Sequence, residues 1–276
     1  MPGSADLHHE EIALERAHGK VNLTLKDAAL QRLFQSGSAK AFLPVTYGKA
    51  TEVVLANTAG GLADGDIFSY EICAEANSRI AATTQAAERV YQALGGGMAE
   101  ARLTIKATGR SDVFWLPHET ILYDRSRFCR RIDVHLDASS KVVLGEIVVF
   151  GRKASGEVMT AGHIEDHWRV HRDGQLVHAE AFRLAGDVRA ILAHAAGANQ
   201  AGVMATLLMI APEELHPLAA TLRNIESTDG AWVGVSSWDG KLVVRLVAPE
   251  LFSIKPTIAT ILERMTSLPL PRAWAL

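Results

Sequence analysis

The sequence predicts a mainly β protein, with strands layered in a large sandwich-like or β-helix-like fold and two α-helices toward the C-terminus. Three observations support this fold class. Apolar or alternating runs of strand length follow one another from residue 21 to residue 247. Two Asp-Gly pairs, beginning at Asp173 and Asp239, each separate two such runs and indicate hairpins. Helical periodicity is clear only near the end of the chain.

The N-terminal part of the chain begins with sixteen polar, acidic residues that we expect to be poorly ordered. Val21, Leu23 and Leu25 then alternate with polar residues, which is typical of a half-buried strand. Residues 28–42 are mixed and contain Ser36-Gly-Ser38, so we expect a loop with at most one helical turn. Further strands are predicted at 52–56, 67–72, 78–85, 88–92, 101–107, 112–116 and 119–123.

The clearest strand covers residues 127–137, where apolar and polar residues separate onto two faces. One face carries Phe128, Ile132, Val134 and Leu136; the other carries Arg127, Arg131, Asp133 and His135. Residues 141–150 are apolar apart from Glu146 and single Lys and Gly residues, which predicts a strand buried on both faces. The remaining strands are predicted at 168–172, 175–184, 202–210, 232–236 and 242–247.

Two helices are predicted in the last part of the chain. Residues 212–223 begin with Pro212 and two glutamates and carry a leucine stripe. Residues 251–265 are amphipathic, and Pro256 either kinks this helix or marks its start. No linker composition and no fixed-period repeat divides the chain, so we expect a single domain over residues 1–276.

Composition limits the classes of function. Hydrophobic residues make up 48% and charged residues 21%, as in ordinary globular proteins. A net charge of −3 argues against nucleic-acid binding. No apolar run reaches membrane-spanning length, and residues 1–20 lack the order of a signal peptide. Cys73 and Cys129 are far apart, which favours reduced thiols and a cytoplasmic location.

The segment from Asn57 to Asp66 reads NTAGGLADGD and lies between two predicted strands, as a hairpin-type connection does. Its glycines permit positive φ, so a plain surface turn is the simpler interpretation. A phosphate-binding loop is excluded because Asp66 stands where the lysine of that motif belongs.

Several polar residues within apolar surroundings are candidate site residues. Glu146 needs a partner if it is buried, and Arg152, with Glu157 nearby, is the nearest candidate in sequence. A structural ion pair and a functional carboxylate both remain open. Glu119 is either half-buried or a strand-end residue facing water, and Thr84 and Gln85 are unspecific by themselves.

The histidines His163, His167 and His171 recur every fourth residue, on one face of a strand or helix. They could form a metal site or a surface stripe without a role. The order His-Ile-Glu-Asp-His at 163–167 differs from the HExxH of hydrolytic zinc sites. The chain also lacks the GxSxG of a serine nucleophile elbow.

Taken together, these stretches resemble one family, the urease accessory protein UreD, also known as UreH. The resemblance covers nearly the whole chain. It rests on NTAGGLADGD at 57–66, ATTQAAERVY at 82–91, WLPHETILYDRSRF at 115–128, GEIVVFGRKASGE at 145–157, the Asp173-Gly174 turn and PRAW at 271–274. The family usually carries a glycine where Ala63 or Asp64 stands, so the conformation of this loop can differ.

The resemblance implies a nickel-insertion chaperone without catalytic activity. Members of the family bind apo-urease subunits and UreF, which in turn holds the GTPase UreG, and they offer nickel a water-filled internal route. By this resemblance, the residues expected along the route are Asp66, Thr84, Gln85, Glu119 and Glu146. Isolated carboxylates, hydroxyls and amides suit transient Ni²⁺ passage, so no tight metal site and no tightly bound cofactor are expected. Structural or partner-binding roles are expected for Gly60, Gly61, Arg152, Arg272 and Trp274.

Three alternatives remain open on the sequence. An all-β hydrolase could use Asp64, Asp66 or Glu119 as acid and base. Its aromatic platforms would be Trp115 and Tyr91. A plain β scaffold would need its buried polar groups only for structure. At the C-terminus, Trp274 beside Arg272 is either part of the UreF interface or a plug that packs on the core.

Overall fold

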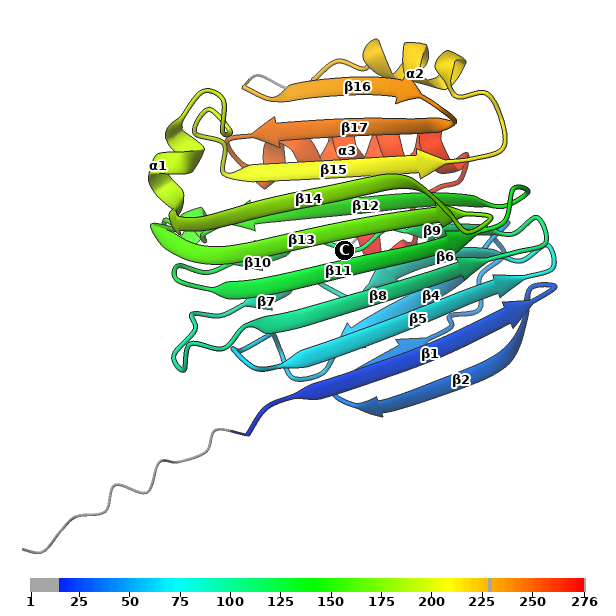
Figure 1. Ribbon diagram of the computed structural model, residues 1–276, viewed down its shortest axis with the longest axis horizontal. Helices are drawn as coiled ribbons and strands as arrows, with labels where there is room; N and C mark the ends of the chain where they lie inside the picture. The colour runs from blue at the N-terminus through cyan, green and yellow to red at the C-terminus, as the bar shows by residue number, and fades with distance from the viewer. Residues whose placement is uncertain (1–14, 228–229, 276) are drawn as a thin grey trace, which may run out of the picture.

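A computed structural model describes residues 15–227 and 230–275 and contains two large β-sheets packed face to face, with two of the helices outside the ten-stranded sheet (Figure 1). The seven-stranded sheet contains, in spatial order, β14 (Gln175–Asp187), β13 (Ala161–Arg172), β11 (Arg127–Leu136), β8 (Ala99–Ala107), β5 (Ile67–Glu75), β1 (His18–Lys26) and β2 (Ala29–Gly37). The ten-stranded sheet contains β16 (Trp232–Trp238), β17 (Lys241–Ala248), β15 (Val203–Ile210), β12 (Lys141–Phe150), β9 (Asp112–Trp115), β6 (Arg79–Thr84), β4 (Thr51–Asn57) and β3 (Ala39–Phe42), with β7 (Glu88–Val90) and β10 (Thr120–Leu122) attached.

The chain winds between the two sheets. From β4 to β13 it passes from one sheet to the other, with β7 and β10 as short strands between turns. Strands that this winding places side by side are parallel, as β5 and β8 are, and β8 and β11. The strands added at the ends of the sheets pair antiparallel, as β1 with β2, β13 with β14 and β12 with β15. This arrangement confirms the prediction of stacked, β-helix-like layers. It also shows that the hairpin interpretation of residues 57–66 is wrong, because β4 and β5 lie in different sheets.

Two cores follow from the strand patterns. The face of β11 that carries Phe128, Ile132 and Val134 packs between the sheets, opposite Val142 and Leu144 of β12. The other face of β12 packs against the helices, which explains why this strand is apolar on both faces. The result is a three-layer molecule in which the ten-stranded sheet is the middle layer.

Three helices belong to the described chain: α1 (Val188–Ala193), α2 (His216–Arg223) and α3 (Leu251–Thr266). Two short 3₁₀ helices cover Lys153–Ser155 and Arg272–Ala275. The prediction for residues 212–223 placed the helix start too early, since α2 begins at His216 with Pro217 in its first turn. Pro256 lies inside α3, and α1 was not predicted.

The prediction for residues 28–42 was wrong, because they form β2 and β3. All nine residues of β2 are exposed, so this edge strand lacks the apolar alternation that marks a half-buried strand. The expectation for residues 1–16 falls almost entirely outside the described residues. Within the described residues, no helix is long and apolar enough to cross a membrane. Cys73 is half-buried and Cys129 is buried, and both are free thiols.

Candidate functional site

Interruptions in the strands of the ten-stranded sheet create the site. β6 ends at Thr84 and β7 begins at Glu88, while β9 ends at Trp115 and β10 begins at Thr120. β12 runs past both: its residues 141–144 pair with β9 and its residues 148–150 pair with β10. Glu146 lies between these two paired segments. Pro117 explains the second interruption, since proline cannot donate to a sheet ladder.

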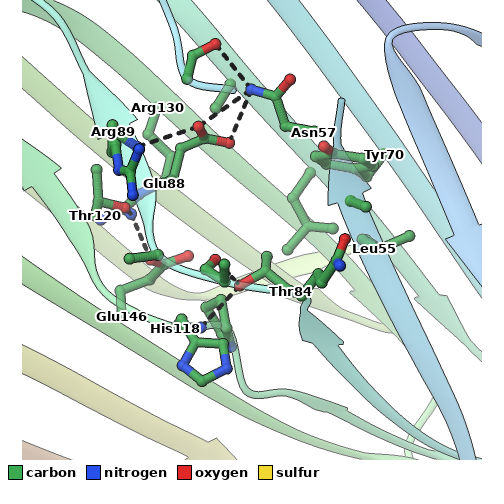
Figure 2. A pocket seen from close by; sticks show the side chains of 18 of the residues that line it. Leu55, Asn57, Tyr70, Thr84, Glu88, Arg89, His118, Thr120, Arg130 and Glu146 are labelled. Atoms are coloured by element: carbon green, nitrogen blue, oxygen red, sulfur yellow. Dashed lines mark hydrogen bonds and ion pairs between the residues drawn. The ribbon is translucent and has the colours of Figure 1, made fainter. Parts of the chain in front are cut away.

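An interior cavity of about 230 Å³ lies along these interruptions, between the two sheets (Figure 2). The ten-stranded sheet and its connections contribute polar groups, including Thr84, Gln85 and Glu146. The facing seven-stranded sheet contributes Tyr70, Leu103, Phe128 and Arg130. Several lining residues, Gln85 among them, are exposed, so the cavity reaches the surface.

One end of the cavity carries Glu88, whose carboxylate accepts hydrogen bonds from the side-chain amide of Asn57 at 3.1 and 3.3 Å. The same amide donates to the carbonyl of Gly61 at 3.0 Å. Burial raises the pKa of Glu88 to about 7, although the hydrogen bond from Asn57 acts in the opposite direction. This carboxyl group is therefore partly protonated near neutral pH.

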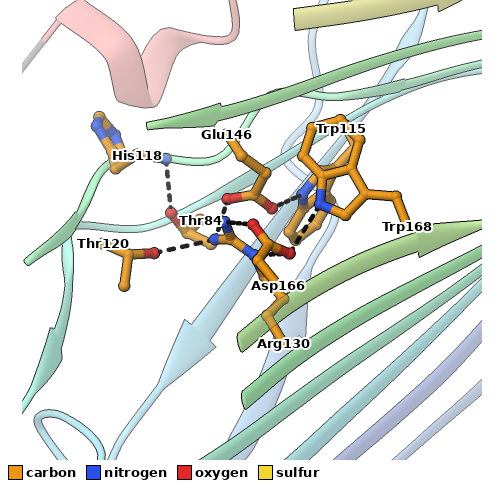
Figure 3. Close-up of polar contacts among 8 residues, drawn as sticks. All are labelled: Thr84, Trp115, His118, Thr120, Arg130, Glu146, Asp166 and Trp168. Atoms are coloured by element: carbon orange, nitrogen blue, oxygen red, sulfur yellow. Dashed lines mark hydrogen bonds and ion pairs between the residues drawn. The ribbon is translucent and has the colours of Figure 1, made fainter. Parts of the chain in front are cut away.

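The inner end of the cavity is a buried charged cluster formed by Arg130, Glu146 and Asp166 (Figure 3). These residues come from β11, β12 and β13 and are only 6%, 4% and 8% exposed. Nη1 of Arg130 pairs with Glu146, and Nη2 and Nε pair with Asp166. We call this group the Arg130 cluster. It connects the two sheets, since Arg130 and Asp166 belong to one sheet and Glu146 to the other.

Two indole groups complete the Arg130 cluster. Nε1 of Trp115 donates to Glu146 and Nε1 of Trp168 donates to Asp166, both at 2.8 Å. Burial raises the pKa of Glu146 to about 7, and the charge of Asp166 adds to this effect, against the opposing effect of Arg130. Two buried carboxylates thus share one guanidinium, which leaves the cluster one positive charge short when both are ionised.

A second, smaller cavity of about 50 Å³ lies on the far side of the Arg130 cluster. Arg130 and Glu146 line both cavities. The second cavity also contacts Asp166 and extends to Glu180 and the exposed Arg245, which form an ion pair. The two cavities therefore approach each other from opposite sides of the cluster and adjoin at Arg130 and Glu146.

The five residues proposed for an internal route divide into two groups. Thr84, Gln85 and Glu146 line the same cavity. Asp66 and Glu119 are not among the residues that line it. The carboxylate of Asp66 accepts the backbone N–H groups of Ala17 and Ala63 at 2.7 and 2.8 Å. Glu119 forms an ion pair with Lys255 of α3 at 3.2 Å, beside the cavity wall.

The ion pair between Glu146 and Arg152, one of the two alternatives left open by the sequence, does not form. Arg152 pairs with Glu157 at 2.8 Å and stacks on the ring of Tyr123, 4.0 Å from its centroid. It lines a surface groove of about 680 Å³ instead of the interior cavity. Sequence proximity suggested Arg152, whereas the partner is Arg130 on the opposite sheet.

Gly60 and Gly61 close the outer end of the cavity. Gly61 has φ +153°, and a Cβ atom there would lie 2.5 Å from the ring of Tyr91. The Tyr91 hydroxyl donates to the carbonyl of Gly60 at 2.7 Å. The glycine pair thus permits the close approach of Tyr91, a structural role for this part of the loop.

The C-terminal tail folds back across the molecule to the middle of the ten-stranded sheet (Figure 1). Nε1 of Trp274 donates to the carbonyl of Leu116 at 2.9 Å, and its ring stacks on His118 with centroids 5.6 Å apart. Trp274 is half-buried against the helix-side core, whereas Arg272 is exposed. These contacts favour the plug alternative for Trp274.

The histidine series of β13 is not a metal cluster. His163 and His167 flank Glu165, at 2.9 and 3.7 Å, on the outer face of the strand. His171 stacks on His135, with centroids 5.2 Å apart. Across the residues that the structure describes, no three His, Cys, Asp or Glu side chains converge on a metal position.

The sequence analysis missed Glu88 at one end of the cavity, and Arg130 and Asp166 at the other. Arg130 shares the two-residue spacing of Phe128, Ile132 and Val134, so it belongs to the inward face of β11. That single polar residue on an apolar face was the available signal. Asp166 alternates in the same way with Ile164 and Trp168 on β13.

Comparison with known proteins gives a consistent result. A family model described as UreD urease accessory protein matches residues 16–275. The chain is 41% identical to a urease accessory protein UreD of Rhizobium leguminosarum bv. trifolii, over 95% of this chain and 96% of that protein. It is 39% identical to one from Xanthobacter autotrophicus, over 96% and 92%, and 38% identical to one from Rhodopseudomonas palustris, over 95% of each chain.

Proposed function

Because this chain belongs to the UreD family of urease accessory proteins and so has a role in urease maturation, we propose that it is a chaperone that passes Ni²⁺ to apo-urease through its interior. The observation that carries this proposal is the pair of cavities that meet at the buried carboxylate of Glu146. A charged side chain at such a position costs stability, which favours a functional reason for keeping it.

The chemistry of the cavity wall suits a cation in transit. Ni²⁺ accepts oxygen ligands, but a complete cage of them would retain the ion. The wall instead offers separated groups: the hydroxyl of Thr84, the amide of Gln85 and the carboxylates of Glu88 and Glu146. Such single ligands can replace part of the hydration shell of the ion without trapping it. Nickel is here the cargo, bound only transiently.

We further propose that this transfer takes place in a cytoplasmic complex in which the chain binds apo-urease subunits on one side and UreF on another, with UreG held through UreF. The described surface offers large exposed apolar side chains for such contacts. They include Leu30, Phe34, Phe42, Val45 and Tyr47 near β2 and β3, and Phe252, which is 91% exposed, at the start of α3.

The test is Glu146→Gln in cells that activate urease. The substitution removes the negative charge of Glu146 but keeps the shape of the side chain, and Arg130 keeps its pairing with Asp166. We therefore expect stability to change by no more than about 1 kcal/mol, because the lost charge-assisted hydrogen bonds and the relieved burial of charge act in opposite directions. Urease activation should fall strongly, while the thermal midpoint of the purified complex should change by roughly 3 °C or less.

Glu157→Gln is the matched control. It removes the same charge from an ion pair, with Arg152, that lies outside the interior cavity. We expect normal urease activation with this variant. If both variants activate urease normally, the carboxylate of Glu146 has no part in nickel transfer. A midpoint that falls together with activation in Glu146→Gln would assign the residue to stability alone.

No observation favours the hydrolase alternative. Asp64 binds Arg16 at 3.2 Å and the backbone N–H of Gly95 at 2.7 Å. Asp66 likewise accepts hydrogen bonds from backbone N–H groups, and Glu119 pairs with Lys255. The described residues that line the interior cavity include none of these three acids. Hydrolysis of a glycoside by the purified protein would revive this alternative.

A further inference from the structure

We propose that Arg130 closes the passage between the two cavities and that its guanidinium occupies the position that a divalent cation takes between Glu146 and Asp166. Passage through the molecule then requires the guanidinium to move aside. This inference rests on the proposed function for its biological role, but the cation position itself can be tested without urease.

The geometry of the Arg130 cluster provides a position for a cation. Two carboxylates from opposite sheets face one cationic group, which contacts both of them (Figure 3). Each carboxylate is held in place by a tryptophan N–H at 2.8 Å, Trp115 for Glu146 and Trp168 for Asp166. Both carboxylates therefore stay oriented toward the space between them when the guanidinium leaves.

The net charge of the Arg130 cluster favours a divalent cation at this position. With both carboxylates ionised, the cluster has a net charge of −1, and replacing the guanidinium by a divalent cation makes it neutral. Carboxylate and hydroxyl oxygens are good ligands for such ions, and the hydroxyl of Thr120 lies 3.4 Å from Nη1 of Arg130. Two carboxylates plus water bind a divalent cation moderately. Competition from Arg130 weakens that binding and so prevents the ion from being retained.

The two cavities adjoin at the Arg130 cluster. Arg130 and Glu146 are the two residues that line both of them, and Asp166 lines the second. The guanidinium therefore separates two spaces that would otherwise be continuous around Glu146. Moving the guanidinium aside requires only a change of the Arg130 rotamer, whereas the carboxylates can separate only if the strands that carry them move apart.

The experiment replaces Arg130 by Met, which keeps an unbranched chain but removes the cation. The full-length protein, co-purified with its partner and freed of metal by a chelator, is titrated with Mn²⁺, and free Mn²⁺ is measured by electron paramagnetic resonance. We expect Arg130→Met to show one Mn²⁺ site whose dissociation constant is at least tenfold lower than that of any corresponding site in the wild type. The gain should disappear in Arg130→Met combined with Asp166→Asn, and Arg130→Lys, which keeps the charge, should show none.

Arg130→Met leaves two buried carboxylates unpaired, so this variant can be too unstable to purify without metal. In that case the measurement is recovery of folded protein with and without 1 mM Mn²⁺. Metal-dependent recovery supports the inference, and equal recovery with and without the ion overturns it. A folded Arg130→Met variant without extra Mn²⁺ binding also overturns it. If Mn²⁺ binding is gained but Glu146→Gln still activates urease, the cation position stands and the nickel route fails.

Discussion

Replacing Trp274 by Ala tests whether the C-terminal tail belongs to the folded core or to a partner interface. Deleting a fully buried Trp side chain costs roughly 3–5 kcal/mol. Trp274 is half-buried, so about half of that loss applies, and the carbonyl of Leu116 also loses its 2.9 Å hydrogen bond, for about 1 kcal/mol more. The expected loss is therefore roughly 2.5–3.5 kcal/mol, and the thermal midpoint should fall by roughly 5–14 °C.

The assay is thermal unfolding of the purified protein, followed by circular dichroism, with capture of the UreF-like partner measured in parallel. Phe252→Ala is the matched control, because Phe252 is 91% exposed and its removal should change stability by less than about 0.5 kcal/mol. An unchanged midpoint in Trp274→Ala, together with lost partner capture, would refute the reasoning and assign the tail to the interface.

Three further outcomes are expected. The pKa of Glu88 is raised to about 7 in the folded protein, so the folded state binds this proton more tightly than the unfolded state does, and the free energy of unfolding falls as the pH rises from about 4.5 to 7. Glu88→Gln lacks this loss, so between pH 5 and pH 8 its free energy of unfolding should gain roughly 1–3 kcal/mol relative to wild type, measured by urea unfolding at each pH. Gly61→Ala should destabilise by roughly 2–3 kcal/mol because its Cβ meets Tyr91, whereas Gly60→Ala, where the space is open, should cost only about 1 kcal/mol; equal midpoints would contradict this difference. Co-expression with a UreF-like partner should raise the soluble yield, because side chains such as Tyr47 and Phe252 are almost fully exposed, and an unchanged yield would argue against an obligate interface.

The sequence predicted those strands whose burial is one-sided or complete. β11 and β12 were located because their apolar patterns directly reflect one buried face and two buried faces. β2 was missed because all its residues are exposed, so tertiary position alone makes it a strand. The change of sheet between β4 and β5 was also missed, since a connection rich in glycine looks the same in a hairpin and in a crossover.

The candidate site shows the same division between local and long-range information. Glu146 could be recognised because a lone carboxylate in an apolar run is a local feature. Its partner could not, because Arg130 and Asp166 reach it only through the stacking of β11, β12 and β13. The apolar pattern around Arg130 carries the information that this side chain points inward, which the sequence analysis did not use, but it carries none on what the side chain meets there.

The winding of the chain sets the order in which this protein can fold. Each turn pairs strands about thirty residues apart, as Ile67 with Glu100 and Phe128 with Ala99. A parallel pair cannot form until the later strand exists, so structure grows from the N-terminal turns as the ribosome delivers new ones. Asp166 arrives on β13, after Arg130 and Glu146, so Arg130 can pair only with Glu146 until that late step. Until then the last completed turn presents an open edge, and slow synthesis of residues 137–172 would prolong the time during which nascent chains can associate.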